Sequence, residues 1–140
     1  MEVKHGRGYV YAIAYHFVWC VKYRHSVLSG QVAETLRELL EATANEHGLA
    51  IEALEIMPDH VHLLVLATPQ QGIPTLVKLL KGVSARRMFQ RHPELKRHLW
   101  GGHLWNPSYF ISTVGKTNEA QVRRYIEEQG AKGIQSHLNP

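Results

Sequence analysis

Apolar and polar positions alternate along the chain with two different periods. Four segments show the period of two that is typical of strands, and three show the spacing of three or four residues that is typical of amphipathic helices. The strands are expected at residues 9–23, 49–57, 60–67 and 109–114. The helices are expected at residues 31–47, 73–91 and 118–129. The predicted order is therefore β-α-β-β-α-β-α.

Glycine, proline and capping residues set the predicted ends of these elements. Gly48 follows the first helix as a C-terminal stop, and Pro58-Asp59 makes the tight turn of a hairpin. Thr117 is predicted as the N-cap of the last helix. Gly130 is expected to end that helix, which leaves residues 131–140 as a polar and loose tail.

This order of elements predicts an α+β fold of the ferredoxin-like, or RRM-like, type. The first six elements match the split β-α-β pattern, in which an antiparallel sheet carries two helices on one face. The other face, or an edge of the sheet, is then left for a partner. The pattern does not say where the last helix packs.

Length and composition indicate a single globular domain. The chain has 140 residues and no internal repeat or linker, so residues 1–140 are expected to form one domain. Its 44% hydrophobic and 20% charged residues are close to the globular average. The single Cys20 excludes an internal disulfide framework and a cysteine-based zinc site. Neither a membrane-spanning apolar run nor a secretory signal is found, so no membrane partner and a cytoplasmic location are expected.

Charge is distributed unevenly along the chain, although the formal net charge is only +4. Acidic residues dominate the segment 34–59, and basic residues dominate the segment 78–97. One surface is therefore expected to repel phosphate groups and another to attract them. Two ordinary solvated helix faces would explain the same distribution.

Two histidines mark the third predicted strand as a candidate metal site. His60 and His62 are two residues apart, so both imidazoles point to one side of the strand, while Val61, Leu63 and Val65 point to the other. Two imidazoles on a rigid strand are suited to binding a metal ion, but a third ligand is needed. The alternative is a pair of histidines that lines a surface or completes a core.

The last predicted helix carries a tyrosine and an amide on one face. Tyr125 and Gln129 are four residues apart, and Gln121 continues the same polar stripe. Val122 and Ile126 point toward the body of the protein. The functional interpretation is a phenol aimed at an electrophile, with an amide oxygen that reaches a metal ion. The alternative is a tyrosine with a packed ring and a solvated hydroxyl.

Several motifs, taken in order, resemble those of one enzyme family. They include His-Val-His at 60–62, Trp-Gly-Gly at 100–102 and Tyr-x-x-x-Gln at 125–129, within matching stretches at 6–11, 15–24, 57–64, 81–87 and 99–110. Together they cover nearly the whole chain, about residues 6–130. The chain resembles the single-tyrosine HUH transposases of the insertion sequence 200/605 group, the TnpA proteins.

The resemblance implies a role for each matched side chain. Tyr125 would be the nucleophile, and His60, His62 and Gln129 would bind a divalent metal ion, Mg²⁺ or Mn²⁺. It implies cleavage and rejoining of single-stranded DNA at insertion-sequence ends through a 5′-phosphotyrosine link. It also implies recognition of hairpins formed by those ends, and a homodimer in which each last helix completes the partner's site. The general base for Tyr125 is not indicated.

Basic and aromatic residues are the candidates for contact with this DNA. Phosphate contacts are predicted for Lys78, Lys81, Arg86, Arg87, Arg91, Arg7, Lys22, Arg24, Arg123 and Arg124. Base stacking is predicted for Trp100 and Trp105, for which the alternative is a role as core anchors. For the two arginines beside Tyr125, the alternative is pairing with Glu119 and Glu127. The remaining histidines, including His16, are expected to be surface or packing residues.

Two other interpretations stay open. A non-catalytic module that binds single strands or RNA on the same sheet, as in RRM domains, would leave the histidine pair and Tyr125 unexplained. A host-domesticated relative that cleaves repeated palindromes would share the chemistry. A covalent protein–DNA product separates the enzyme from the binding module, whereas only substrate preference or genomic context separates the two enzymes.

Overall fold

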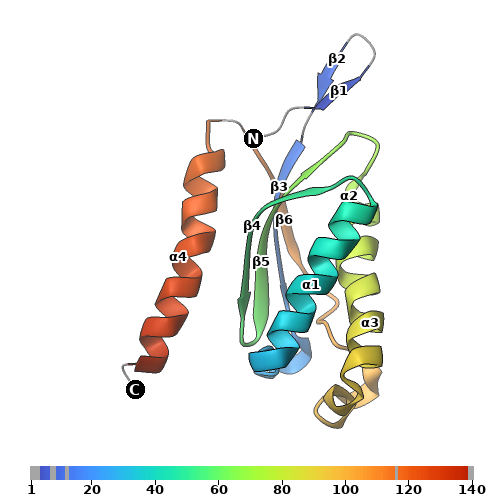
Figure 1. Cartoon of the computed structure of the whole chain (residues 1–140), viewed down its shortest axis with the longest axis vertical. Coiled ribbons are helices and arrows are strands. Elements are labelled where there is room, and N and C mark those ends of the chain that lie inside the picture. Colours follow the sequence, from blue (N-terminus) through green and yellow to red (C-terminus); the bar gives the residue numbers. More distant parts are fainter. Residues whose placement is uncertain (1–3, 7–8, 12, 116, 139–140) are drawn as a thin grey trace.

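A computed structural model of the chain describes residues 4–6, 9–11, 13–115 and 117–138 (Figure 1). The strands are β1 (Lys4–Gly6), β2 (Tyr9–Tyr11), β3 (Ile13–Cys20), β4 (Ala50–Met57), β5 (His60–Ala67) and β6 (Phe110–Val114). The helices are α1 (Gly30–Glu46), α2 (Ile73–Val77), α3 (Val83–Arg91) and α4 (Glu119–Leu138), and a π-helical turn (Lys78–Gly82) joins α2 to α3. Within these described ranges, no helix is both long enough and apolar enough to cross a membrane.

Four of the strands form an antiparallel sheet in the order β4-β5-β3-β6. This order, together with the succession of strands and helices, confirms the predicted ferredoxin-like fold. The predicted hairpin at Pro58-Asp59 joins β4 to β5. Seven of the eight residues of β5 are buried, as expected for a central strand that is covered on both faces. The β1–β2 hairpin is a separate small sheet that the sequence pattern does not predict.

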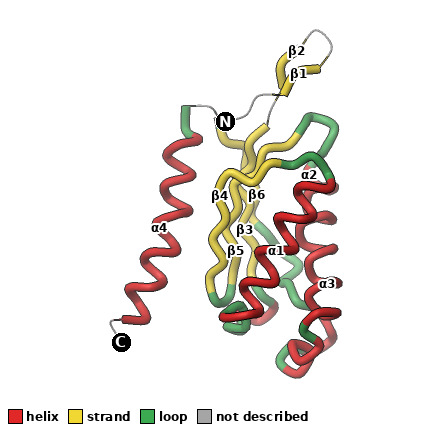
Figure 2. The backbone as a smooth tube through the Cα atoms, viewed as in Figure 1, coloured by secondary structure: helices red, strands yellow, loops and turns green. Residues whose placement is uncertain are grey.

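One face of the sheet is covered by α1 and by the α2–α3 helix (Figures 1 and 2). This layer contains the main hydrophobic core, in which alternate residues of the central strands meet the apolar stripes of the helices. Its fully buried side chains include Phe17, Trp19, Leu36, Leu40, Leu63, Leu80 and Met88. Each buried side chain of this size contributes roughly 1.5–3 kcal/mol to folding.

The opposite face of the sheet is covered by α4, which packs against β4 and β5 of its own chain (Figure 1). A second, smaller core joins the helix to the sheet, with Val122 at its margin; it consists of Ala14, Ala53, Leu64, Leu66 and Ile126. The prediction that Val122 and Ile126 point toward the body is confirmed. The structure therefore answers the question that the sequence pattern leaves open, which is where the last helix packs.

The last helix does not end at Gln129, so the predicted stop at Gly130 is wrong. The helix continues to Leu138, through the segment 131–138 that the sequence marks as a loose tail. Gly130 lies against β4, where an added Cβ would be 2.8 Å from the carboxyl carbon of Glu55. The glycine therefore leaves room for the Glu55 carboxylate of β4, and it does not terminate the helix.

Three other predictions about the elements need correction. The first strand ends at Cys20 rather than at residue 23, because the chain turns away from the sheet at Lys22–Arg24; residue 12 lies outside the described residues. The alternation predicted over 49–57 is interrupted by a bulge between Ile51 and Ala53, which shifts these side chains to different cores. Finally, α4 begins at Glu119, so Asn118 rather than Thr117 precedes the first helical residue.

Candidate active site

The two histidines of β5 face α4. The ring centroids of His60 and His62 are 4.9 Å apart. Leu64, on the same side of the strand, belongs to the small core under α4, whereas Val61 and Leu63 belong to the main core. The structure thus confirms that both imidazoles point to one side of the strand, and it shows that this side is the one opposite the main helical layer.

His62 is the more buried of the two histidines, with 7% of its surface exposed. Burial, followed by repulsion from His60 and His16, lowers the pKa of His62 to about 4. The ring is therefore neutral at pH 7, which is the form that binds a metal ion. Its Nδ1 is buried and finds no hydrogen-bond partner among the described residues. A neutral ring with an unpaired nitrogen fits the role of a metal ligand.

His60 is held by a carboxylate. Its Nδ1 lies 2.6 Å from Oδ1 of Asp59, and Nε of Arg24 donates to Oδ2 of Asp59 at 2.9 Å. Burial alone would raise the pKa of Asp59, but the hydrogen bonds from His60 and Arg24 hold this pKa below its ordinary value. The sequence pattern marks Asp59 only as a turn residue, although its place directly before His60 is a signal. The guanidinium of Arg24 is paired with Asp59 but its side chain is 61% exposed, so the predicted DNA contact of Arg24 stays a prediction.

Tyr125 reaches the histidine pair from α4. Its ring centroid is 6.0 Å from that of His62, and the two rings are nearly perpendicular. The side chain is 47% exposed, so the phenol is accessible from solvent. The structure therefore brings the predicted nucleophile and one predicted metal ligand together within a single chain.

Gln129 lies one helical turn after Tyr125 and is half-buried. It adjoins Gly130, which lies against Glu55, and Glu55 is opposite His62 in the register of the sheet. In the part of the chain that the structure describes, no three His, Cys, Asp or Glu side chains are grouped for metal binding. An ion at the histidine pair would therefore need a third ligand of another kind. The amide of Gln129 suits this role by its chemistry and its position.

His16 belongs to this site, although the sequence analysis expects it to be a surface or packing residue. Its ring centroid lies 5.9 Å from that of His62, 6.2 Å from Tyr125 and 5.7 Å from Phe110. Its Nε2 is buried without a partner among the described residues, and burial lowers the pKa of the ring. The one available signal is that His16 alternates with the core residues of β3. Only the pairing of β3 with β5 shows that it is beside His62.

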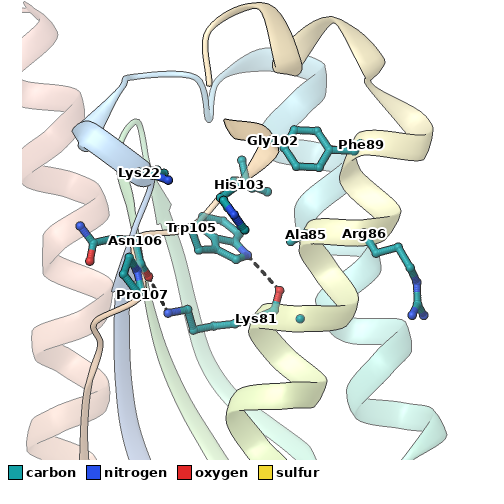
Figure 3. A pocket seen from close by; sticks show the side chains of 12 residues that line it. Lys22, Lys81, Ala85, Arg86, Phe89, Gly102, His103, Trp105, Asn106 and Pro107 are labelled. Carbon is teal, nitrogen blue, oxygen red and sulfur yellow. Dashed lines mark hydrogen bonds between the residues drawn. The ribbon is translucent and has the colours of Figure 1, made fainter. Parts of the chain in front are cut away.

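A cavity of about 440 Å³ lies on the helical side of the molecule, between α3, Lys22 and the loop 102–107 (Figure 3). Its lining combines cations with flat apolar groups, and includes Lys22, Arg86, His103, Phe89, Trp105 and Pro107. Arg86 is exposed and Lys22 is half-buried. Such a lining suits an unpaired nucleotide, because phosphates attract cations and bases stack on flat groups.

Two residues with predicted DNA contacts are buried and hydrogen-bonded within the protein. Lys81 is 7% exposed, and its Nζ donates to the carbonyl oxygens of Asn106 at 2.7 Å and Ser108 at 3.3 Å. Trp105 is 6% exposed, packs perpendicular to Trp19 and donates from Nε1 to the carbonyl of Lys81 (Figure 3). The structure gives Lys81 and Trp105 a role within the fold, and their predicted contacts with DNA stay predictions. For Trp105, the alternative of a core anchor is confirmed.

Arg123 is also engaged within the protein. Its Nη2 lies 2.5 Å from Glu52 and 3.4 Å from Glu119, so it ties α4 to the bulge of β4. The alternative of pairing with Glu119 is confirmed, and the DNA-contact prediction for Arg123 stays a prediction. Arg87 lies 3.8 Å from Glu46 and stays partly exposed.

The other predicted DNA contacts remain available or lie outside the description. Among these predicted contacts, the exposed cations are Lys78, Arg86, Arg91 and Arg124. Arg7 and the side chain of Trp100 lie outside the described residues. The predictions for these residues are neither confirmed nor corrected by the structure.

Comparison with known sequences places the chain in a family. Residues 9–129 match the family described as transposase IS200 like. The chain is 58% identical over 132 residues to the ISDra2 transposase TnpA of Deinococcus radiodurans, with 94% of each chain covered. It is 28% identical over 115 residues to the transposase for insertion sequence element IS200 of Salmonella typhimurium, with 82% of this chain and 75% of the relative covered. The chain therefore belongs to the IS200-like transposase family.

Comparison with solved structures agrees with this placement. A crystal structure of a candidate transposase from Deinococcus radiodurans is similar with a TM-score of 0.75 and 56% identity, over 90% of this chain and 97% of that chain. A REP-associated tyrosine transposase bound to a REP hairpin is similar with a TM-score of 0.64 and 16% identity, over 94% of this chain and 74% of that chain. The second likeness shows the shared fold alone.

Proposed function

We propose that this protein cleaves and rejoins single-stranded DNA at the ends of an insertion sequence, with Tyr125 as the nucleophile. The observation that carries the proposal is the Tyr125 ring, 6.0 Å from His62 and partly open to solvent, in a member of the IS200-like family. The 58% identity to an insertion-sequence transposase supports a mobile-element substrate over the palindromes of a domesticated relative.

In the proposed reaction, the Tyr125 oxygen attacks the scissile phosphorus in line. A bond between this oxygen and phosphorus forms while the bond from phosphorus to the 3′ oxygen of the preceding nucleotide breaks. The phenol releases its proton to solvent, and the 3′ oxygen takes up a proton. The products are a 5′-phosphotyrosine link and a free 3′-hydroxyl. Because the phosphodiester bond energy is kept, a 3′-hydroxyl of another strand can reverse the attack and join strands without ATP.

His60, His62 and the amide oxygen of Gln129 would hold a divalent ion, Mg²⁺ or Mn²⁺. When bound, such an ion withdraws charge from the non-bridging phosphate oxygens and stabilises the transition state. The low pKa of His62, about 4, keeps this ligand free of a competing proton at pH 7. Nitrogen ligands suit Mn²⁺ at least as well as Mg²⁺.

The proposed substrate is a single-stranded DNA end that forms a hairpin. The structural relative with 16% identity is bound to a REP hairpin. On this chain, the cavity beside Lys22 and Arg86 offers cations and flat apolar groups, and Lys78 and Arg91 add exposed charge on the same helical segment. Binding through these cations should weaken steeply as salt is raised, because phosphate binding releases counterions.

We further propose a homodimer in which each α4 can complete the partner's site. β6 is an edge strand of the sheet, and edge strands associate readily by strand addition. In this single chain, α4 packs against β4 and β5 of the same chain. A helix exchanged between two subunits would deliver the same Tyr125 to the same kind of site.

The proposal is tested by mixing the protein with hairpin oligonucleotides that carry varied single-stranded flanks. On a denaturing gel, a covalent protein–DNA band is expected with Mg²⁺ or Mn²⁺ and not with chelator. Tyr125→Phe should still shift the hairpin on a native gel but should form no covalent band, because it lacks the attacking oxygen.

Tyr23→Phe is the matched control, since Tyr23 is also an exposed tyrosine, at 60%, and lies outside the site. It should form the covalent band as the unmodified protein does. A band that persists in Tyr125→Phe would show that another residue is the nucleophile. A chain that binds hairpins but never forms a band would favour the binding module.

A further inference from the structure

Three side chains from two separate segments form a hydrogen-bonded row that ends at one of the two histidines. Arg24 donates to Asp59 at 2.9 Å, and Asp59 lies 2.6 Å from Nδ1 of His60. We propose that Asp59, held by Arg24, is a positioning residue that fixes the ring orientation and tautomer of His60 for metal binding. This inference rests on the proposed function, because it assigns the purpose of the row to a metal ion at the histidine pair.

The carboxylate determines which ring nitrogen carries the proton. An ionised carboxylate only accepts hydrogen bonds, so the 2.6 Å contact with Asp59 requires a proton on Nδ1 of His60. The lone pair is then on Nε2. Metal-binding histidines commonly donate their other ring N–H to a carboxylate in this way.

The backbone around Arg24 is shaped to deliver the guanidinium to this position. Tyr23 and Arg24 have φ values of 60° and 54°, in the left-handed region that residues other than glycine rarely adopt. The amide of Val21 donates to the carbonyl of Asp59 at 2.8 Å, and the amide of Leu28 donates to the carbonyl of Pro58 at 3.0 Å. The segment 21–28 is thus hydrogen-bonded to the hairpin turn at both of its ends. The two residues with left-handed backbone are Arg24, which pairs with Asp59, and the residue before it.

The two histidines differ in this respect. His62 is buried, and its Nδ1 has no hydrogen-bond partner in the described part of the chain. His60 is the first residue of β5 after the turn and is more open, with 20% of its side chain exposed. The more exposed of the two histidines is therefore the one that has a carboxylate partner, as expected if the carboxylate holds that ring in place.

The experiment measures Mn²⁺ binding to the full chain by electron paramagnetic resonance, without DNA. Asp59→Ala should weaken Mn²⁺ binding by about 10–100-fold, the usual cost of losing such a partner. Asp59→Asn keeps an acceptor and should recover part of the loss. Arg24→Gln should weaken binding less than Asp59→Ala. Thermal melting checks that each variant is folded.

The chain provides a matched control in a second carboxylate–histidine pair. Glu94 lies 3.0 Å from Nδ1 of His92, on the helical side and away from the site. Glu94→Ala should leave Mn²⁺ binding unchanged. A folded Asp59→Ala variant that binds Mn²⁺ as tightly as the unmodified protein would overturn the proposal, and an unchanged Arg24→Gln would overturn the part assigned to Arg24.

A second measurement does not depend on metal or on activity. Long-range ¹H–¹⁵N spectra report the ring tautomer of His60, assigned by comparison with His60→Gln. The Nδ1–H form is expected in the unmodified protein, and a mixture with the Nε2–H form is expected in Asp59→Ala. An unchanged tautomer would count against the proposal. If the unmodified protein binds no Mn²⁺ but shows the tautomer change, the metal part of the proposed function fails while the Asp59–His60 link stands.

Discussion

At the scale of single residues, His62 shows how burial determines protonation. The ring is enclosed between the sheet and α4, and loss of water makes the charged form costly. Two further imidazoles, His60 and His16, face the same space and oppose a positive charge there. The site is therefore built to keep a neutral imidazole at physiological pH, which leaves positive charge to an incoming cation.

This burial predicts a loss of stability in mild acid. The pKa of His62 is about 4 in the folded chain and 6.5 when exposed, so between these values the unfolded chain binds a proton that the folded chain does not. The free energy of unfolding should therefore decrease as pH falls from about 6.5 to 4. Urea unfolding with chelator present, at a series of pH values, measures this slope.

His62→Gln is the informative variant, because glutamine does not titrate. Its stability should depend less on pH over the same window than that of the unmodified protein. His16 also has a lowered pKa and contributes with the same sign, so part of the slope should persist. An identical slope in the two proteins would contradict the assignment of this effect to His62.

At the scale of elements, α4 lies outside the main core. None of its described side chains belongs to the main core, and Ile126 is its single fully buried anchor in the small core. The ion pair of Arg123 with Glu52 adds a second attachment. The element that carries the proposed nucleophile is thus anchored by a small core, while the histidines lie on the central strand β5 of the sheet.

Ile126→Ala is expected to release α4 without unfolding the rest of the domain. Truncating a buried isoleucine to alanine usually lowers the free energy of unfolding by roughly 2–5 kcal/mol. We expect this loss to exceed the free energy that holds α4 on the sheet, because the interface between them is small. Amide hydrogen exchange should accelerate across 119–138 and remain slow in β5 and α1. Covalent DNA adduct formation should fall strongly.

The contrast is provided by Glu128→Ala, which changes an exposed residue of the same helix. It should leave exchange in α4 unchanged, since surface substitutions usually alter stability by less than about 0.5 kcal/mol. Faster exchange throughout the whole domain in Ile126→Ala would show that α4 is part of one cooperative unit, against this prediction.

At the scale of the whole molecule, the two faces of the sheet have different properties. The face under α4 carries the candidate active site, and the helical side carries the cationic cavity. The acidic segment, which includes α1, and the basic segment, which includes α3, do not form two separate surfaces. The two helices pack against each other in one layer, and Arg87 of α3 lies near Glu46 of α1. Local charge near the cavity is therefore a better guide to DNA binding than the segment totals.

Exchange of α4 between subunits can be tested by complementation. The Tyr125→Phe variant keeps both histidines, and the His62→Ala variant keeps the tyrosine. A dimer of one subunit of each has one complete site only if α4 of the His62→Ala subunit packs on the histidines of the Tyr125→Phe subunit. If the two variants pair at random, co-expression should restore roughly a quarter of the wild-type sites. Each variant alone should form no adduct, and the covalent band is the measurement. A co-expressed sample with no band would contradict shared sites and leave the arrangement within one chain.

Much of the site could be inferred from local patterns. The alternation in β5 predicts that His60 and His62 share one side, and helical spacing predicts that Tyr125 and Gln129 share a face. The order of elements predicts the sheet. These inferences succeed because the direction of a side chain relative to its own strand or helix depends only on the backbone period.

Contacts between distant segments were decided by the tertiary structure alone. Packing places α4 over its own β4 and β5 and brings His16 beside His62. It also joins Arg24 to Asp59 and buries Lys81 and Trp105. The sequence pattern predicts Gly130 as a helix stop, whereas in the fold this glycine leaves room for the Glu55 side chain of β4. The amino-acid sequence by itself determined which residues face the same way on each element. Which elements meet depends on how the apolar faces fill space together, and no local period contains that information.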